Sequence, residues 1–233
     1  MQARAKAQAP GPVAQAYRAL AERGAISPDP AQIEAAHLLD GIAEALGRAR
    51  PRGLLARFAE PEPVRGACIW GEVGRGKTML MDLFFELVPV RGKRRVHFNA
   101  FMADVHDRIA RHRAALKTGE ARGTDPIPPV AAALAREAWV LCFDEFSVTD
   151  IADAMILSRL FSALFAEGVV LVATSNVAPD ELYRDGLNRG LFEPFIEILK
   201  RHAAVMRLDN GTDYRLEKLN RLPVYITPLG PKA

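Results

Sequence analysis

The stretch that decides the fold is ACIWGEVGRGKTMLMDLFFEL, residues 67–87. Residues 67–70 form a short apolar run, and residues 78–87 have the length and the apolar content of a helix. The segment between them contains three glycines. A short apolar run that ends in glycine is typical of a strand buried on both faces. The stretch therefore predicts a buried strand, a glycine-rich turn and a helix, in that order.

The same alternation of short apolar runs and helical stretches continues along the chain. Further strands are predicted at 95–99, 139–143, 169–173 and 205–208, and further helices at 102–116, 151–165 and 194–201. Continuous hydrophobicity in the strands indicates burial on both faces, and helices between strands indicate crossover connections. The sequence therefore predicts a three-layer α/β fold in which helices cover both sides of a parallel sheet.

The composition is that of a globular protein with a buried core. Of 233 residues, 49% are hydrophobic and 25% are charged, which excludes a disordered or collagen-like chain. The longest apolar stretches, 138–143 and 168–173, are far shorter than the ~18 residues of a membrane span, so we expect at most peripheral membrane association. The formal charge of +3 is too small to imply a nucleic-acid partner. Cys68 and Cys142 lie in apolar runs without metal-ligand spacing, which predicts reduced core thiols.

Three regions are expected along the chain. Residues 1–65 comprise a basic leader, an amphipathic helix over 31–50 and a connector punctuated by Pro and Gly. The first twenty residues lack acids, and we expect a frayed terminus there, with an organelle transit peptide as the alternative. Residues 66–210 form the α/β core. Residues 211–233 form a short β extension with strands at 214–216 and 224–227, and no helical bundle follows them.

The glycine-rich turn matches a phosphate-binding pattern, GxxxxGK[ST]. The matching residues are Gly71, Glu72, Val73, Gly74, Arg75, Gly76, Lys77 and Thr78. Glycines let backbone N–H groups converge on an anion, and the helix N-terminus adds the positive end of its dipole. The pattern predicts a nucleoside triphosphate site in which Lys77 reaches the β- and γ-phosphates and Thr78 holds Mg²⁺.

Two adjacent carboxylates, Asp144 and Glu145, end the predicted strand 139–143. Taken alone, acids after an apolar run more often mark a solvated strand end. Combined with the phosphate-binding turn, they indicate that Asp144 accepts a hydrogen bond from Mg²⁺-bound water and that Glu145 polarises the water that attacks the γ-phosphate. The pair therefore predicts that the chain hydrolyses ATP without a helper protein.

Polar residues farther along the chain supply additional candidates. Asn176, after the strand 169–173, is expected to sense the γ-phosphate, with Thr174 and Ser175 as alternatives; these residues could also simply start a turn. Arg189 is the preferred candidate for an arginine finger that enters a neighbouring subunit, with Arg184 second. Either arginine could instead be a solvated surface charge.

Five segments, in this order and at these separations, carry a resemblance; the third and fourth are much more specific than a phosphate loop alone. They are WGEVGRGKTMLMDLFF, RVHFNAFMADVH, VLCFDEFSVTDIADAMIL, VVLVATSNVAPDELYRDGLNR and DYRLEKL. They resemble the AFG-like ATPases, a family of AAA+ proteins, and the resemblance extends from about residue 17 to about residue 229. It implies the strand order 5-1-4-3-2 and a Mg²⁺-dependent ATPase that acts as a homo-oligomer, with ATP bound between subunits.

The resemblance also implies partners. Bacterial members of the family act on the tubulin-like FtsZ division ring, and mitochondrial members act in the turnover of inner-membrane proteins. We therefore expect a cytoplasmic remodeller of a protein substrate, recruited to the inner membrane or the division site. Because no helical bundle follows the C-terminal strands, a helical lid is expected to be absent or truncated. A nucleotide-gated adaptor with little turnover is the alternative function; a replication-type loader is weaker, because a basic aromatic stripe is lacking.

Three further residues have open roles. Phe101 and Met102 follow the second predicted strand, where AAA+ rings carry the loop that grips substrate in the pore. Aromatic and Met residues that enter a helix are more often part of the core, which is the favoured interpretation here. Gln32, close to Asp29 and Pro30, is a weak candidate for reading adenine.

Overall fold

The computed structural model describes residues 9–49 and 64–208. Its centre is a five-stranded sheet in which all neighbouring strands are parallel. In spatial order the strands are β2 (Lys93–His97), β3 (Val140–Asp144), β4 (Val170–Ser175), β1 (Gly66–Trp70) and β5 (Ala203–Arg207). This is the order 5-1-4-3-2 read from the opposite edge, so the predicted topology is confirmed.

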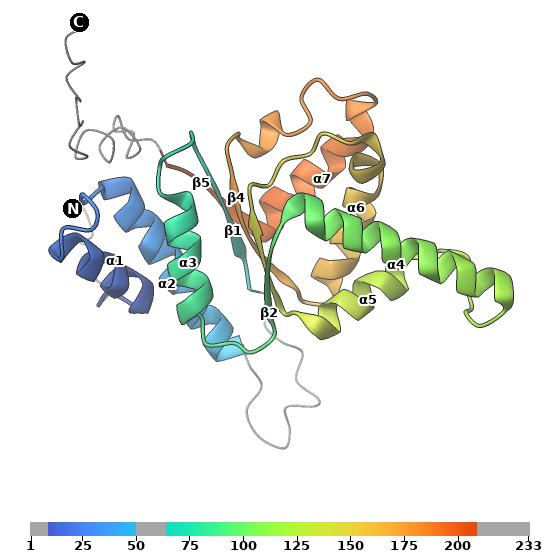
Figure 1. The fold of residues 1–233 in the computed structure, drawn as a ribbon, viewed down its shortest axis with the longest axis horizontal. Coiled ribbons are helices and arrows are strands. Elements are labelled where there is room, and N and C mark those ends of the chain that lie inside the picture. The colour runs from blue at the N-terminus through green and yellow to red at the C-terminus, as the bar shows by residue number, and fades with distance from the viewer. Residues whose placement is uncertain (1–8, 50–63, 209–233) are drawn as a thin grey trace, which may run out of the picture.

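Helices cover both faces of the sheet, which confirms the predicted three layers (Figure 1). One face carries α1 (Pro12–Glu22), α2 (Pro30–Ala49) and α3 (Lys77–Leu87). The other carries α4 (Phe98–Thr118), α5 (Ile127–Glu137), α6 (Ile151–Ala166) and α7 (Arg189–His202), with the short 3-10 helix η2 (Pro179–Glu181) before α7. Within residues 9–49 and 64–208, which Figure 1 draws in colour, no helix has both the length and the hydropathy of a membrane-spanning helix.

Alternation along the strands divides the core in two. In β3, Val140 and Cys142 pack with the side chains of α1, α2 and α3, whereas Leu141 and Phe143 pack with those of α4 to α7. Successive side chains of a strand point to opposite faces. Asp144, the last residue of β3, therefore lies on the α3 side of the sheet. The fold thus directs this carboxylate toward the helix that follows the glycine-rich turn.

The N-terminal segment differs from the prediction. Residues 12–22 form α1 instead of a frayed end, and Val13, Ala14 and Tyr17 are buried. The side chain of Asp40, on α2, accepts hydrogen bonds from the backbone N–H groups of Val13 at 2.7 Å and Ala14 at 3.1 Å. A carboxylate at the first turn satisfies free donors and matches the helix dipole. The cap comes from another helix, so no local signal in residues 1–20 predicts it.

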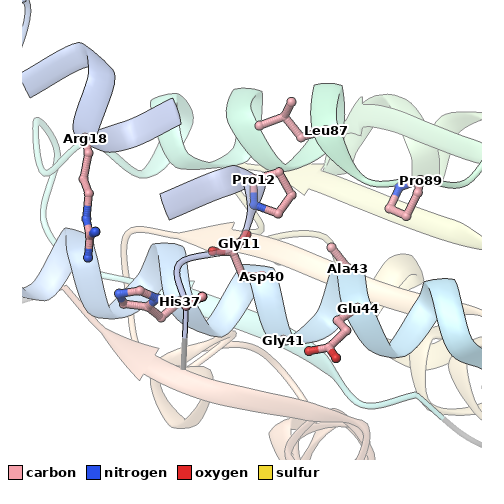
Figure 2. Close-up of a pocket in the computed structure, with 11 residues that line it drawn as sticks. Gly11, Pro12, Arg18, His37, Asp40, Gly41, Ala43, Glu44, Leu87 and Pro89 are labelled. Atoms are coloured by element: carbon pink, nitrogen blue, oxygen red, sulfur yellow. The ribbon is translucent and has the colours of Figure 1, made fainter. Parts of the chain in front are cut away.

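A cavity of about 810 Å³ lies between α1, α2 and the C-terminal end of α3 (Figure 2). Gly11 lies against Asp40 at its edge, and a Cβ there would come within 2.5 Å of the Asp40 Cγ. Leu87, the last residue of α3, lines the cavity, whereas the glycine-rich turn lies at the N-terminal end of this helix. The cavity is therefore at the opposite end of α3 from the predicted phosphate site.

The boundary between β2 and α4 also differs from the prediction. β2 ends at His97 and α4 begins at Phe98, so residues 98–102 form the first turns of a helix and not a loop. Phe101 and Met102 have exposed fractions of 0% and 1%. Phe101 packs against Phe143, with ring centroids 4.8 Å apart. The two side chains are core residues, as the favoured interpretation held, and the pore-grip alternative is wrong.

Other predicted elements differ mainly in their ends. β3 and β4 extend to the polar residues Asp144 and Ser175, and α5 was not among the predicted helices. α7 begins at Arg189 and contains Pro194 within the helix, whereas the sequence pattern placed the proline at its start. The predicted strands 214–216 and 224–227 lie outside the described residues, as does the region where a lid would follow.

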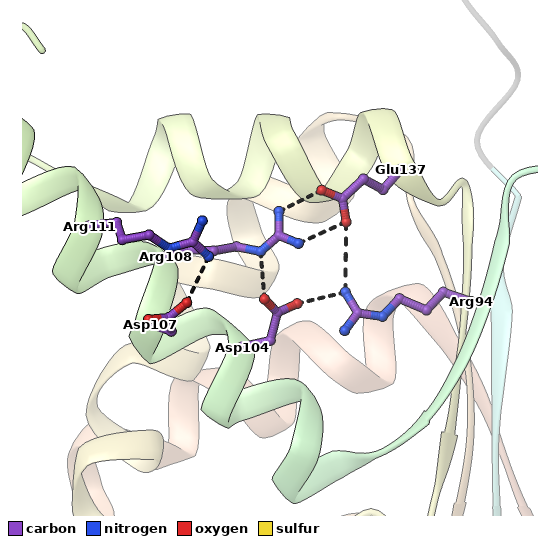
Figure 3. Close-up of polar contacts among 6 residues, drawn as sticks. All are labelled: Arg94, Asp104, Asp107, Arg108, Arg111 and Glu137. Carbon is purple, nitrogen blue, oxygen red and sulfur yellow. Dashed lines mark hydrogen bonds and ion pairs between the residues drawn. The ribbon is translucent and has the colours of Figure 1, made fainter. Parts of the chain in front are cut away.

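A network of charged side chains joins β2, α4 and α5 (Figure 3). Asp104 accepts hydrogen bonds from Arg94 at 2.7 Å and from Arg108 at 2.8 Å, and Arg108 also binds both carboxylate oxygens of Glu137. Burial acts to raise the pKa of Asp104, but the hydrogen bonds from the two arginines outweigh it and lower the pKa below 3.8. The network therefore stabilises the fold above that pH, and its contribution is lost as the pH falls through the folded-state pKa.

Both cysteines are free and fully buried, as their apolar surroundings predicted. Cys68 lies in β1 and Cys142 in β3, separated by β4. Burial raises the pKa of each thiol to about 12. Since the thiolate is the reactive form, both residues are chemically inert core side chains in the folded protein.

Candidate nucleotide-binding site

The candidate residues converge because three strands that carry them are neighbours. β4 lies between β1 and β3, and all three are parallel, so their carboxyl ends share one edge of the sheet. The glycine-rich turn follows β1, Asn176 follows β4, and Asp144 and Glu145 stand at the end of β3. Strands are spaced by about 4.8 Å, so the ends of β1 and β3 lie roughly 10 Å apart. Ligands of open α/β sheets bind at this edge.

The turn 71–78 has the backbone of an anion-binding loop. Gly74 and Gly76 have φ angles of 88° and 82°, which residues with a Cβ rarely adopt. The Gly71 N–H donates to the Ser175 carbonyl at 3.1 Å, which fixes the start of the loop to β4. The Gly76 carbonyl accepts from the Leu80 N–H at 3.1 Å, so α3 starts directly at the end of the loop. An anion held in this loop would lie at the positive end of α3.

The side chain of Lys77 folds back so that its ammonium group lies within the loop 71–78. It is buried, and its Nζ donates to the carbonyl oxygens of Gly71 at 2.6 Å and Glu72 at 2.8 Å. The ammonium group therefore lies inside the curve of the backbone, where a phosphate bound by the loop would meet it. Thr78 is exposed in the first turn of α3, and Asp144 ends β3. A hydroxyl and a carboxylate are the hard oxygen donors that Mg²⁺ prefers, so these residues fit a Mg²⁺ ion.

The side chain of Gln32, on α2, is hydrogen-bonded to the backbone of the loop 71–78. Its exposed fraction is 2%, and its Nε2 donates to the Arg75 carbonyl at 2.9 Å. A Cβ at Gly76 would lie only 2.6 Å from this nitrogen. Gln32 itself follows the cap of α2, since Asp29 Oδ1 accepts from the Gln32 N–H at 3.2 Å. Gln32 therefore braces the loop in this structure, and nothing in its contacts supports the predicted role in reading adenine.

Asp144 is held by an arginine that the sequence did not single out. Arg95, on β2, donates from Nε to Asp144 Oδ2 at 2.7 Å and from Nη2 to Oδ1 at 3.2 Å. Its Nη1 also pairs with Asp82, on α3. Burial acts to lower the pKa of the guanidinium, but the hydrogen bonds to Asp144 and Asp82 raise it on balance. The available signal was an arginine inside a strand, a place where charged side chains need partners.

Glu145 occupies an uncommon backbone conformation at the site. Its φ is 52°, the left-handed region that non-glycine residues seldom adopt. Thr174 fixes this turn: its Oγ1 accepts from the Glu145 N–H at 3.3 Å, and its carbonyl accepts from the Phe146 N–H at 2.7 Å. Ser175 donates from Oγ to the Phe146 carbonyl at 2.9 Å. The end of β4 thus sets the direction of Glu145, whose side chain is exposed.

Asn176 is exposed one residue beyond β4. Thr174 and Ser175, the alternatives to it, are buried and bonded to the turn after β3. Of these three residues, Asn176 is therefore the one whose side chain faces solvent at the carboxyl edge of the sheet. Glu145, whose N–H bonds Thr174 two residues before Asn176, has the strained backbone that is typical of functional sites.

The two candidate finger arginines lie on the segment that leads into α7. Arg189 is half-buried and donates to the carbonyls of Leu182 at 3.1 Å and Asp180 at 2.5 Å. Arg184 is exposed and pairs with Glu181. The guanidinium of Arg189 is thus fixed to its own chain, whereas Arg184 points away from the core.

Comparison with known proteins gives the family. A model of the AFG1-like ATPases matches residues 12–233. The cell division protein ZapE of Escherichia coli (strain K12) is 44% identical over 232 residues, which cover 94% of this chain and 60% of ZapE. Lactation elevated protein 1 homolog B of Danio rerio is 52% identical over 164 residues, covering 69% of this chain and 33% of that protein.

Solved structures with low sequence identity share the fold. Domain III of the Thermotoga maritima replication initiation protein DnaA superposes with a TM-score of 0.50 and 18% identity, covering 79% of this chain and 65% of that chain. The structure of DnaI gives a TM-score of 0.51 and 16% identity, covering 82% and 87%. At such identities the likeness shows the AAA+-type fold alone.

The family match confirms the resemblance that the five sequence segments suggested. The chain spans 60% of the length of the bacterial relative it matches, so the activity of the whole relative does not transfer automatically. The match nevertheless extends over the glycine-rich turn, the Asp–Glu pair and the segment that leads into α7. The chain therefore belongs to the AFG1-like ATPase family.

Proposed function

We propose that the chain binds Mg·ATP in the loop 71–78 and hydrolyses it. Lys77 and the loop amides bind the phosphates, Thr78 and Asp144 hold Mg²⁺, and Asn176 senses the γ-phosphate. Glu145 accepts the proton of the attacking water. The observation that carries this proposal is the turn after β3, where Thr174 holds Glu145 at a φ of 52° at the same edge of the sheet as the loop. Backbone strain of this kind is found at functional sites, and here it occurs at the carboxylate residue that shares the sheet edge with the phosphate loop.

We further propose that the protein assembles with ATP between subunits and that Arg189, which here bonds carbonyls of its own chain, exchanges those bonds for a phosphate in a neighbouring site. Two exposed leucines flank this arginine, Leu187 at 71% and Leu191 at 54% exposed. Large apolar side chains exposed together around a functional arginine favour a protein interface. We expect the mass in solution to rise when a slowly hydrolysed ATP analogue is added. Replacing both leucines with Glu should keep the protein monomeric; assembly unchanged by these substitutions would argue against the interface.

The partner is proposed from the similarity to ZapE, whose name refers to cell division. We propose a protein substrate at the division site or the inner membrane, such as the FtsZ ring, and a cytoplasmic location for the ATPase. The formal charge of +3 gives no support for a nucleic-acid partner. The shared fold with DnaA and DnaI does not alter this, because sequence identities of 18% and 16% carry no information on ligands.

Steady-state phosphate release tests the proposal. Wild-type protein with ATP and Mg²⁺ should release phosphate, and Lys77→Ala should reduce the rate to background, because Lys77 is the charge inside the loop. Lys93→Ala is a matched control, since Lys93 also bonds backbone carbonyls but lies at the opposite end of α3. A wild-type rate equal to that of Lys77→Ala would eliminate the remodeller and leave the nucleotide-gated adaptor.

A further inference from the structure

Two adjacent arginines of β2 serve opposite faces of the sheet. Arg94 contacts Asp104 on α4 and belongs to the network of Figure 3. Arg95 lies on the other face, where it meets Asp144 at the end of β3 and Asp82 on α3. The pair therefore offers a comparison within one strand: Arg95 contacts a predicted metal residue, and its neighbour does not.

A cation beside a Mg²⁺ site has an electrostatic cost, because like charges repel at short range. Arg95 brings one positive charge to the two carboxylates that it contacts, Asp144 and Asp82, and so lowers the negative charge available to attract a metal. The planar guanidinium of Arg95 also donates hydrogen bonds to both carboxylate oxygens of Asp144, at 2.7 and 3.2 Å. A bidentate guanidinium fixes the plane of a carboxylate, which a lysine does not do.

The second contact of Arg95 reaches the helix that carries Thr78. Asp82 is four residues after Thr78 on α3, so both lie on the same face of that helix. Arg95 thereby joins the Thr78 side of the site to the Asp144 side through one guanidinium. The relative placement of the two proposed metal residues depends on this connection as well as on the sheet.

We propose that Arg95 is a positioning residue for the metal: it orients Asp144 and holds it at a fixed separation from Thr78. The proposal rests on the proposed function, since it presumes a Mg²⁺ ion bound with nucleotide. Each carboxylate oxygen retains a lone pair beyond the one used by Arg95, so Asp144 can accept a hydrogen bond from metal-bound water while the pair persists.

The test compares nucleotide affinity with and without Mg²⁺. A fluorescent ATP analogue is titrated into the full chain with Mg²⁺ and with EDTA. The Kd in EDTA divided by the Kd in Mg²⁺ gives the contribution of the metal to binding. Outer-shell partners of metal ligands typically affect metal affinity by about 10- to 100-fold. We therefore expect Arg95→Lys and Arg95→Ala each to reduce this ratio by about tenfold or more. Arg94→Lys, the matched control, should leave it unchanged.

Other results would overturn the proposal. If Arg95→Lys kept the wild-type ratio, Arg95 would be only a counter-charge, and if Arg95→Ala increased the ratio, it would oppose the metal. A lower melting temperature with an unchanged ratio would make the role purely structural. Wild-type protein that binds the analogue equally well in EDTA excludes a positioning role but leaves nucleotide binding intact, whereas wild-type protein that binds none contradicts the proposed function itself.

Discussion

Replacing Glu145 with Gln is expected to lower steady-state phosphate release by about a hundredfold or more while ATP stays bound, because general-base catalysis contributes typically 10²- to 10⁴-fold. The amide keeps the shape of the side chain but cannot take a proton from water. The hydrogen bonds that set the turn come from the Glu145 and Phe146 backbone to Thr174, so they persist in the variant. The substitution therefore isolates the chemical step.

Phosphate release and the affinity for a fluorescent ATP analogue are measured on the same preparation. Glu167→Gln is the matched control: this exposed glutamate caps the C-terminal end of α6, before β4, at the other edge of the sheet. It should retain wild-type turnover. A Glu145→Gln protein that hydrolyses ATP within tenfold of wild type would falsify the assignment of Glu145 as the base.

Gly76→Ala is expected to weaken ATP binding by about tenfold or more, which corresponds to about 1.4 kcal/mol. The backbone at Gly76 has φ 82° and ψ 11°, a left-handed conformation that costs an L-residue with a Cβ roughly 1–2 kcal/mol. The new Cβ would also lie 2.6 Å from Gln32 Nε2, which is bonded to the Arg75 carbonyl. Relief of this contact must move the loop or its brace, so the amides no longer converge on the phosphates.

Gly119→Ala is the control for Gly76→Ala, because it introduces the same kind of backbone strain outside the phosphate loop. Gly119 has a φ of 78° at the end of α4, and no atom lies within 4 Å of its ideal Cβ position. We expect it to lower the melting temperature through the same backbone strain and to leave ATP affinity unchanged. Equilibrium titration with the fluorescent analogue and thermal unfolding distinguish the two variants. Equal affinities for Gly76→Ala and wild type would show that the loop tolerates the Cβ.

The sequence predicted those parts of the molecule that depend on local pattern. Buried strands, the glycine-rich turn and the Asp144–Glu145 pair are contiguous in the chain, and their residue types follow from burial or from phosphate chemistry. The strand order came from the family resemblance, since hydrophobic runs alone do not specify which strands are neighbours.

The parts that were missed depend on contacts between distant segments. Asp40 lies within the predicted helix 31–50, and only the packing of α1 on α2 shows that it caps α1. Arg95 lies 49 positions from Asp144, and its role requires the pairing of β2 with β3. Phe98 and Asn99 follow directly on Val96 and His97, so the sequence pattern predicts that the strand extends to residue 99. In the structure α4 begins at Phe98, whose side chain is buried on the face of the sheet that α4 to α7 cover.

The brace behind the phosphate loop has a consequence for how the molecule unfolds. Tyr17 Oη on α1 accepts from the Asp29 N–H, Asp29 caps α2 at Gln32, and Gln32 bonds the Arg75 carbonyl. Stability in proteins is distributed among cooperative units that open together. We therefore expect that loosening α1 weakens the support of the proposed nucleotide loop, and that a force applied to this helix lowers the affinity for ATP.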